Sequence, residues 1–92
     1  MAPAPRQCSE SHAWVFSLQA SYLISCRLAR TALNKWLYKD DCYLGDTCGI
    51  RIGRNRALWK CSSYRDYGTV YFVDCYSARR PHHDAFWRYR RH

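Results

Sequence analysis

The last fourteen residues of the chain, RRPHHDAFWRYRRH (79–92), gather several residue types that bind ligands. They hold five arginines, three histidines, three aromatic residues and a single acid, Asp84. Arginine grips phosphates through a planar, forked guanidinium, and bases of a single strand stack on aromatic rings. One prediction is therefore a nucleic-acid contact. In that contact the phosphates meet Arg79, Arg80, Arg88, Arg90 and Arg91, and the bases stack on Phe86, Trp87 and Tyr89.

Two other interpretations of this stretch stay open, and a third is disfavoured. The aromatic residues could lie at a membrane interface, with the arginines on anionic head groups. The stretch could also be a solvated basic terminus, because chain ends are usually loosely held. A metal site is disfavoured, because the adjacent His82 and His83 point to opposite sides of an extended chain. We therefore predict no metal ligands here.

A second cationic cluster surrounds Gly53-Arg54-Asn55-Arg56, which separates two apolar runs and predicts a hairpin tip. Arg51 alternates with Ile50 and Ile52 and is expected to face solvent. These cations could bind an anionic surface, or they could keep an edge strand soluble. The predicted binding residues of both clusters are Arg51, Arg54, Arg56, Lys60, Arg79, Arg80, Trp87, Arg88, Tyr89, Arg90 and Arg91.

Catalytic patterns are weak in this chain. His12 near Glu10 could form an acid–base pair, as a small ribonuclease would need. Serine, histidine and aspartate occur in no recognisable nucleophile motif, and the stretch GIRIG lacks the spacing and the lysine of a phosphate-binding loop. We therefore predict a protein that is not an enzyme and that uses no cofactor.

Six cysteines predict a disulfide-stapled fold. Structural zinc sites take ligands in pairs about two to four residues apart, and no CxxC occurs here. An even count in a short chain favours disulfides formed in an oxidising compartment, although the spacing does not choose among the possible pairings. The predicted disulfide cysteines are Cys8, Cys26, Cys42, Cys48, Cys61 and Cys75.

The start of the chain and its charge bear on location. MAPAPRQC is typical of the region just after a signal cleavage site, and no apolar run approaches the ~20 residues of a membrane span. We expect a secreted, extracellular protein, with translocation into a host cell as an option. The net charge is +8, of which +4 lies in residues 79–92 and +4 in residues 1–78. Twelve of the fifteen cations are arginine, and fifteen residues are aromatic, a composition typical of binding surfaces.

The elements that must position these residues follow from periodicity. Alternation predicts a strand over 12–18, and apolar residues at three- and four-residue steps predict a helix from about Ala20 to Tyr38, capped by Ser17 or Ser21. Three further strands are expected over 48–53, 56–62 and 69–76, the last apolar on both faces and so central. The expected α+β domain packs one helix on an antiparallel sheet of three to four strands, in the order β-α-β-β-β. We divide the chain into an N-terminal arm (1–11), the domain (12–78) and a basic tail (79–92).

The whole chain resembles the small secreted cysteine-rich proteins of fungi, a class that includes plant-pathogen effectors and virally encoded killer toxins. The resemblance lies in the APAP start, the six spaced cysteines and the basic, tyrosine-rich stretches CGIRIGRNRALWKCSSY and YFVDCY. Together with the disulfide count, the start of the chain and the lack of catalytic motifs, it favours an effector- or toxin-like protein that binds a host or competitor protein without catalysis, and we expect a monomer. Two alternatives stay open: a cationic protein that attacks anionic membranes, and an RNA-binding or ribonuclease-like protein, since some such effectors have ribonuclease-like folds.

Overall fold

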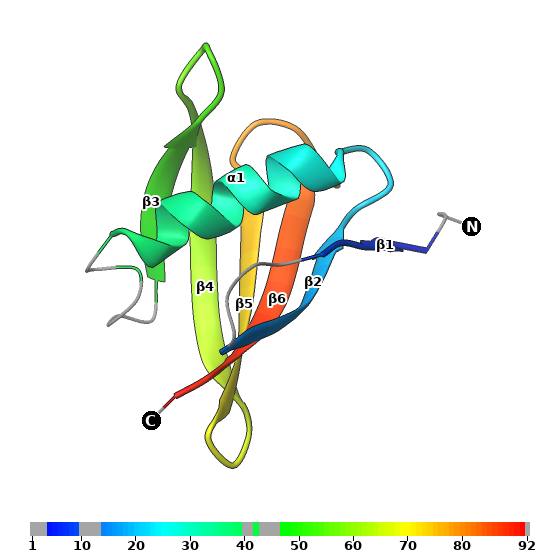
Figure 1. Cartoon of the computed structure of the whole chain (residues 1–92). Helices are drawn as coiled ribbons and strands as arrows, with labels where there is room; N and C mark the ends of the chain where they lie inside the picture. Colours follow the sequence, from blue (N-terminus) through cyan, green and yellow to red (C-terminus); the bar gives the residue numbers. More distant parts are fainter. Residues whose placement is uncertain (1–3, 10–13, 40–41, 43–46, 92) are drawn as a thin grey trace.

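The computed structural model describes residues 4–9, 14–39, 42 and 47–91. In these residues six antiparallel strands form one sheet, in the order β1-β2-β6-β5-β4-β3, and one helix lies across it (Figure 1). The elements are β1 (Arg6–Gln7), β2 (Val15–Ala20), α1 (Cys26–Leu37), β3 (Thr47–Ile52), β4 (Ala57–Tyr67), β5 (Val70–Ser77) and β6 (Asp84–Arg90).

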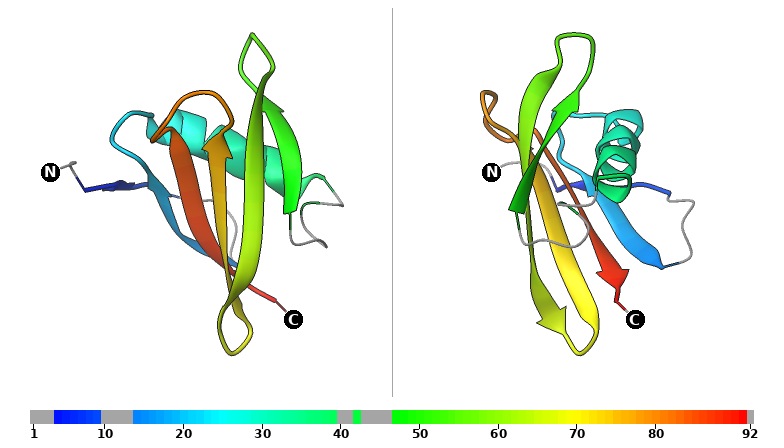
Figure 2. Two further views of the ribbon diagram at one scale, coloured as in Figure 1. Left: turned by 180° about the vertical axis from the view of Figure 1, so that it is seen from behind. Right: turned by 90° about the vertical axis from the view of Figure 1, so that its left-hand side faces the viewer.

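Helix α1 packs on one face of the sheet through an apolar stripe. It begins at Ser25, whose hydroxyl oxygen accepts a hydrogen bond from the amide of Leu28 (3.1 Å) and so satisfies one of the unpaired N–H groups of the first turn. Its buried side chains, at three- and four-residue steps, are Ala29, Ala32, Leu33 and Trp36. The helix therefore covers one side of the sheet and leaves the other side uncovered by any described element (Figure 2).

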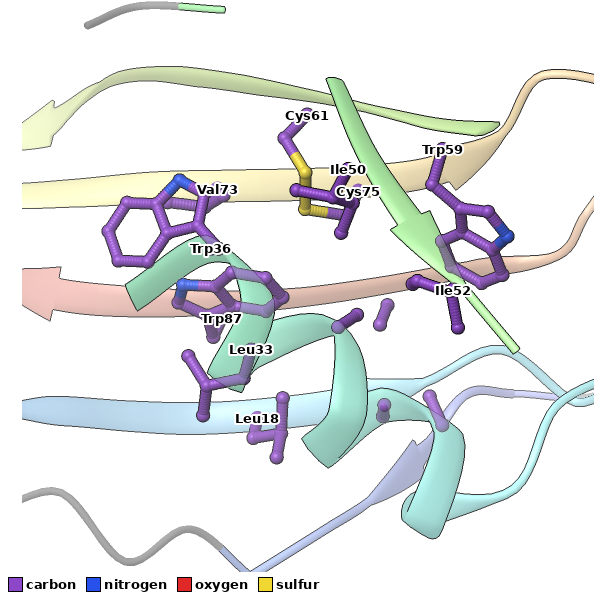
Figure 3. Packing of buried hydrophobic residues seen from close by; sticks show 14 of the residues in the cluster. Leu18, Leu33, Trp36, Ile50, Ile52, Trp59, Cys61, Val73, Cys75 and Trp87 are labelled. Carbon is purple, nitrogen blue, oxygen red and sulfur yellow. A yellow bond between two sulfur atoms is a disulfide. The ribbon is translucent and has the colours of Figure 1, made fainter. Parts of the chain in front are cut away.

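Tryptophan and tyrosine side chains fill the space between α1 and the sheet. The ring centre of Trp36 lies 5.6 Å from that of Trp87 and 5.0 Å from that of Tyr89, and both partners stand on β6. Figure 3 shows Trp36 and Leu33 of the helix directed toward Trp87 and Val73 of the sheet. Burying large aromatic side chains in this way supplies much of the apolar area on which so short a chain depends.

All six cysteines form disulfides, as predicted from their number and spacing. Cys61 and Cys75 are directly opposite each other on β4 and β5. The second disulfide joins Cys42, which follows the helix in the sequence, to Cys48, the second residue of β3. Cys8 and Cys26 join the segment after β1 to the first residue of α1, so the helix is covalently tied to the edge of the sheet.

The predicted sheet of three to four strands is wrong, because the described residues form six. Two strands were missed: β1, which pairs with β2, and β6, which lies between β2 and β5. Residues 84–90 therefore belong to the body of the fold and not to a separate tail. The reason is an alternation in which Ala85, Trp87 and Tyr89 are buried and the residues between them are not.

The helix and hairpin predictions have different outcomes. Helix α1 begins at Cys26 and not near Ala20, because Val15–Ala20 stays paired in the sheet as β2. Its cap is Ser25, and neither Ser17 nor Ser21 has this role. The hairpin at 53–56 is confirmed, since Ile52 pairs with Ala57 across it, and β5 is an interior strand as expected.

Candidate anion-binding site

Two loops that are distant in the sequence meet at one end of the sheet. They are the β3–β4 hairpin tip and the β5–β6 loop, and the amide of Ala78 donates a hydrogen bond to the carbonyl oxygen of Leu58 (3.1 Å) between them. The loops border a pocket of about 770 Å³. We name it the arginine pocket, because its lining includes Arg51, Arg54, Arg56, Arg79 and Arg80, with His83 beside them.

The hairpin tip is held by its backbone. Gly53 adopts a positive φ of 82°, which glycine tolerates without a Cβ penalty, and Arg56 has a φ of 51°. The amide of Arg56 donates to the carbonyl oxygen of Gly53 (3.1 Å), and Nη1 of Arg51 donates to the carbonyl oxygen of Arg56 (3.3 Å). This turn therefore presents Arg54 and Arg56 from a hydrogen-bonded frame.

The β5–β6 loop is held by Ser77. Its hydroxyl oxygen accepts hydrogen bonds from the amides of Arg79 (3.3 Å) and Arg80 (3.0 Å). The amide of Ser77 donates to the carbonyl oxygen of His83 (2.8 Å), which closes the loop at its base. One serine thus positions the backbone of both arginines at the mouth of the pocket.

The charge around the pocket has one sign. Within the described residues, no aspartate or glutamate lines the pocket, and its five arginines form no ion pair with a carboxylate. An anion about 4 Å from one guanidinium gains about 1–4 kcal/mol in a solvated site. Lys35 extends the basic surface beside β3, where it lines a second hollow together with Arg51 and Arg56; Lys39, in the same hollow, donates a hydrogen bond from Nζ to the carbonyl oxygen of Gly49. The arrangement is suited to an anion with several charges.

The face of the sheet opposite α1, named here the open face, is seen from the front in Figure 2 (left). It carries aromatic and acidic side chains as well as cations. On β6 the buried Ala85, Trp87 and Tyr89 point toward α1, so the residues between them point away, and their partners on β5 and β4 follow the same alternation. The ring centre of Phe72 lies 5.3 Å from that of Tyr64 and 5.7 Å from that of Phe86. The central side chains of the open face are Lys60, Tyr64, Phe72, Asp74, Tyr76, Asp84, Phe86 and Arg88.

Arg88 lies over the ring of Phe72, with its guanidinium carbon 5.2 Å from the ring centre. Its Nε also donates to the carboxylate of Asp66 (2.7 Å). Both partners of this ion pair are about one-third exposed, so it contributes little to stability. Its main consequence is to fix a cation beside the aromatic rings and to neutralise one acid of the open face.

Two carboxyl groups, Asp74 and Asp84, lie together on neighbouring strands of the open face. Burial raises the pKa of Asp74 to about 6, and the charge and hydrogen bonding of Asp84 add to this shift. Burial also raises the pKa of Asp84, whose amide donates to the hydroxyl oxygen of Ser21 (3.3 Å). The buried Oδ1 of Asp74 has no hydrogen-bond partner among the described residues. The pair therefore takes up a proton more readily than ordinary aspartates.

The structure places the residues predicted to bind in four regions: the arginine pocket, the open face, the ring of Tyr71 and the hydrophobic core. Arg51, Arg54, Arg56, Arg79 and Arg80 are brought together around the arginine pocket, although the sequence placed them in two unrelated clusters. Lys60 and Arg88 point from the open face, and the exposed Arg90 ends β6 on the same side. Arg91 lies 5.2 Å from the ring centre of Tyr71. Hydrogen bonds from Arg65 and then from Arg91 lower the pKa of that tyrosine.

Trp87 and Tyr89 must be removed from the predicted binding residues. Trp87 is 0% exposed and Tyr89 is 1% exposed, so neither ring can stack on a ligand. Sequence reasoning missed His83, Tyr64 and Phe72. It also missed Asp74, although an acid inside the apolar run YFVDCY was an available signal. His12 and Glu10, the weak acid–base candidates, lie outside the described residues.

In the described part of the chain, no group of three or more histidine, cysteine or acidic side chains is placed to hold a metal ion. No helix there has the length and apolar character needed to cross a membrane. Comparison with protein-family models, curated proteins and solved structures found no match.

Proposed function

We propose that this protein is a secreted, disulfide-stapled binding protein whose ligand is a phosphate-bearing polymer, held by its phosphates in the arginine pocket. The observation that carries the proposal is the convergence of five arginines on one pocket that no described acid lines. Guanidinium groups bind phosphates through two parallel hydrogen bonds, a geometry that they also offer to carboxylates, so the experiment below must separate the two kinds of anion.

The polymeric nature of the ligand follows from the extent of the charge. A single phosphate can be surrounded by two or three guanidinium groups, whereas here five arginines line the arginine pocket and Lys35 continues the basic surface beyond it. The net charge of +8 would further attract a polyanion from a distance. Affinity should therefore fall steeply with salt, by a factor that reports the number of phosphates contacted.

Secretion is the other half of the proposal. Three disulfides in a chain of 92 residues favour an oxidising compartment. The effector- or toxin-like role stays a prediction from the resemblance. An acidic host or competitor protein, or an anionic membrane, is the competing ligand that the experiment must separate from a phosphate polymer.

The test is isothermal titration of the protein with short linear inorganic polyphosphate, a polymer that offers phosphates and no other recognition group. Arg54→Gln with Arg56→Gln should weaken binding about tenfold or more, because each charge-assisted hydrogen bond contributes about 1.5–3 kcal/mol. Arg79→Gln with Arg80→Gln should have a similar effect from the other loop.

The matched control is Arg27→Gln with Arg30→Gln, which removes the same charge from two exposed positions of α1 outside the pocket. This control should retain most of the affinity and the same salt dependence. Equal losses in control and pocket variants would mean that net charge alone attracts the polymer, and the proposal would fail. It would also fail if polyphosphate does not bind while an acidic protein or anionic vesicles do.

A further inference from the structure

We infer that the open face binds the bases of a single-stranded nucleic acid whose phosphates enter the arginine pocket. This inference rests on the proposed function, since it names the polymer that the pocket holds. It adds a second surface, formed by other residues, that a plain phosphate polymer would not use.

The aromatic side chains of the open face are accessible. Tyr64 is 57% exposed and Tyr76 is 40% exposed, whereas the aromatic residues on the α1 side of β6 are fully buried. Phe72 and Phe86, each partly buried, form a continuous group of rings with Tyr64 across β4, β5 and β6, and Tyr76 stands apart from it on the same face. Bases of a single strand stack on such rings with little dependence on sequence.

The open face is continuous with the arginine pocket. Leu58 lines the pocket, and Lys60, Ser62 and Tyr64 follow at every second position along β4. Tyr64 lies six positions after Leu58 along β4, which corresponds to about 20 Å at ~3.3 Å per residue. A strand of a few nucleotides can therefore contact the pocket and the rings at once.

The charges of the open face suit a strand whose backbone runs beside the rings. Lys60 on β4 and the exposed Arg90 at the end of β6 flank the aromatic group and can meet phosphates, whereas Arg88 is paired with Asp66 over the ring of Phe72. The carboxyl groups of Asp74 and Asp84 lie between these cations. They repel phosphates but accept hydrogen bonds from N–H groups on the edges of bases, including the N3–H of uracil and thymine. This division of charge fits bases over the centre of the face and phosphates at its sides.

Other occupants fit these residues less well. In a duplex the base faces are already stacked, so a double helix would leave the rings of Tyr64 and Phe72 without partners. A lipid surface would have to bury the three carboxyl groups of Asp66, Asp74 and Asp84 near its apolar core, which is costly. Single-stranded nucleic acid uses both the rings and the cations.

The experiment measures fluorescence anisotropy of labelled oligouridylate of about ten nucleotides, within the range bound by one small single-strand-binding domain. The matched oligodeoxythymidylate, a duplex of the same length and an abasic oligonucleotide are measured in parallel. The wild-type protein should bind either single strand about tenfold or more tightly than the duplex or the abasic backbone. The two single strands decide between RNA and DNA as the preferred form.

Tyr64→Ser and Tyr76→Ser test the surface directly. Each should weaken binding of the single strand about tenfold, the size expected for loss of one stacked base, and should leave binding of the abasic backbone unchanged. Tyr38→Ser is the control, because Tyr38 is 83% exposed at the end of α1, on the other side of the sheet. It should change neither affinity.

The two proposals fail in different ways. If the abasic backbone binds as tightly as the single strand and Tyr64→Ser has no effect, the inference about the open face is refuted, while the arginine-pocket variants can still support phosphate binding. If the arginine-pocket variants bind all ligands as well as the wild type, the proposed function fails first. Retained near-ultraviolet circular dichroism in each variant establishes that lost binding is not lost folding.

Discussion

Asp74 makes the folding stability of this protein depend on pH. Its pKa is raised from 3.8 to about 6 in the folded chain, chiefly by burial. A carboxyl group with a raised pKa binds its proton more tightly in the folded than in the unfolded state. The contribution of Asp74 to stability should therefore be fully present below about pH 4 and be lost as the pH rises through about 6.

The magnitude follows from the size of the shift. One pKa unit corresponds to about 1.36 kcal/mol, so the shift of Asp74 sets an upper limit of about 3 kcal/mol. Asp74 is only partly buried, and the cations Lys60 and Arg88 lie on the neighbouring strands beside it. Solvent screening reduces the expected loss between pH 4 and 7 to about 1–2 kcal/mol.

The substitution that tests this is Asp74→Asn, which keeps the shape and can donate a hydrogen bond to Asp84. At pH 7 it should raise the free energy of unfolding by about 1–2 kcal/mol, because the buried negative charge is gone. At pH 4 it should change little. The corresponding rise in Tm at pH 7 is at least about 4 °C for a chain of this length.

The assay is urea unfolding followed by tryptophan fluorescence at several pH values between 4 and 8, with the disulfides intact. Asp66→Asn is the control: it makes the same chemical change at the partly exposed partner of Arg88 and should not reproduce the stabilisation of Asp74→Asn at pH 7. If Asp74→Asn follows the wild-type curve at every pH, or is less stable than the wild type at pH 7, the argument from burial is wrong.

Three further predictions follow from single features of the fold. Replacing Cys8 and Cys26 by alanine should lower the free energy of unfolding by about 3 kcal/mol in urea titrations, since the bridge closes a loop of 18 residues; an unchanged midpoint would contradict this. Ser25→Ala should cost about 1 kcal/mol through loss of the helix cap, whereas Ser25→Asp should retain the cap and the melting temperature. Binding of oligouridylate should tighten as the pH falls from 8 to 5, because protonation removes negative charge from the open face. Asp74→Asn should flatten that dependence, and parallel curves for both proteins would refute it.

The β6 strand shows where sequence reasoning stopped. Its residues DAFWRYR alternate between buried and partly exposed positions, a pattern that is visible in the sequence. The charges of Arg88 and Arg90 favoured a solvated tail. Charge can be read from these residues alone, whereas the strands with which they pair lie elsewhere in the sequence. Only the contacts with β2 and β5 make Trp87 and Tyr89 core residues and leave Arg88 on a surface.

The candidate site shows the same limit. Arg51, Arg54 and Arg56 were recognised as one cluster, and Arg79 and Arg80 as part of another. Their meeting around one pocket depends on β4 pairing with β5, which brings the hairpin tip beside the β5–β6 loop. Cross-strand neighbours of this kind have no signal in a single sequence, because pairing order is a non-local property.

The sequence by itself determined the local and chemical properties of this protein: the disulfides from cysteine number and spacing, the hairpin at 53–56 from its turn residues, one amphipathic helix, and a basic, arginine-rich composition. The tertiary structure alone decided the strand order, which aromatic rings are buried beneath α1 and which stand on the open face, and the union of two arginine clusters in one pocket. The physical reason is that turn chemistry, helix periodicity and cysteine pairing capacity are encoded over a few residues. Which side chains are buried, and which strands are neighbours, depends on how segments distant in the sequence pack against one another.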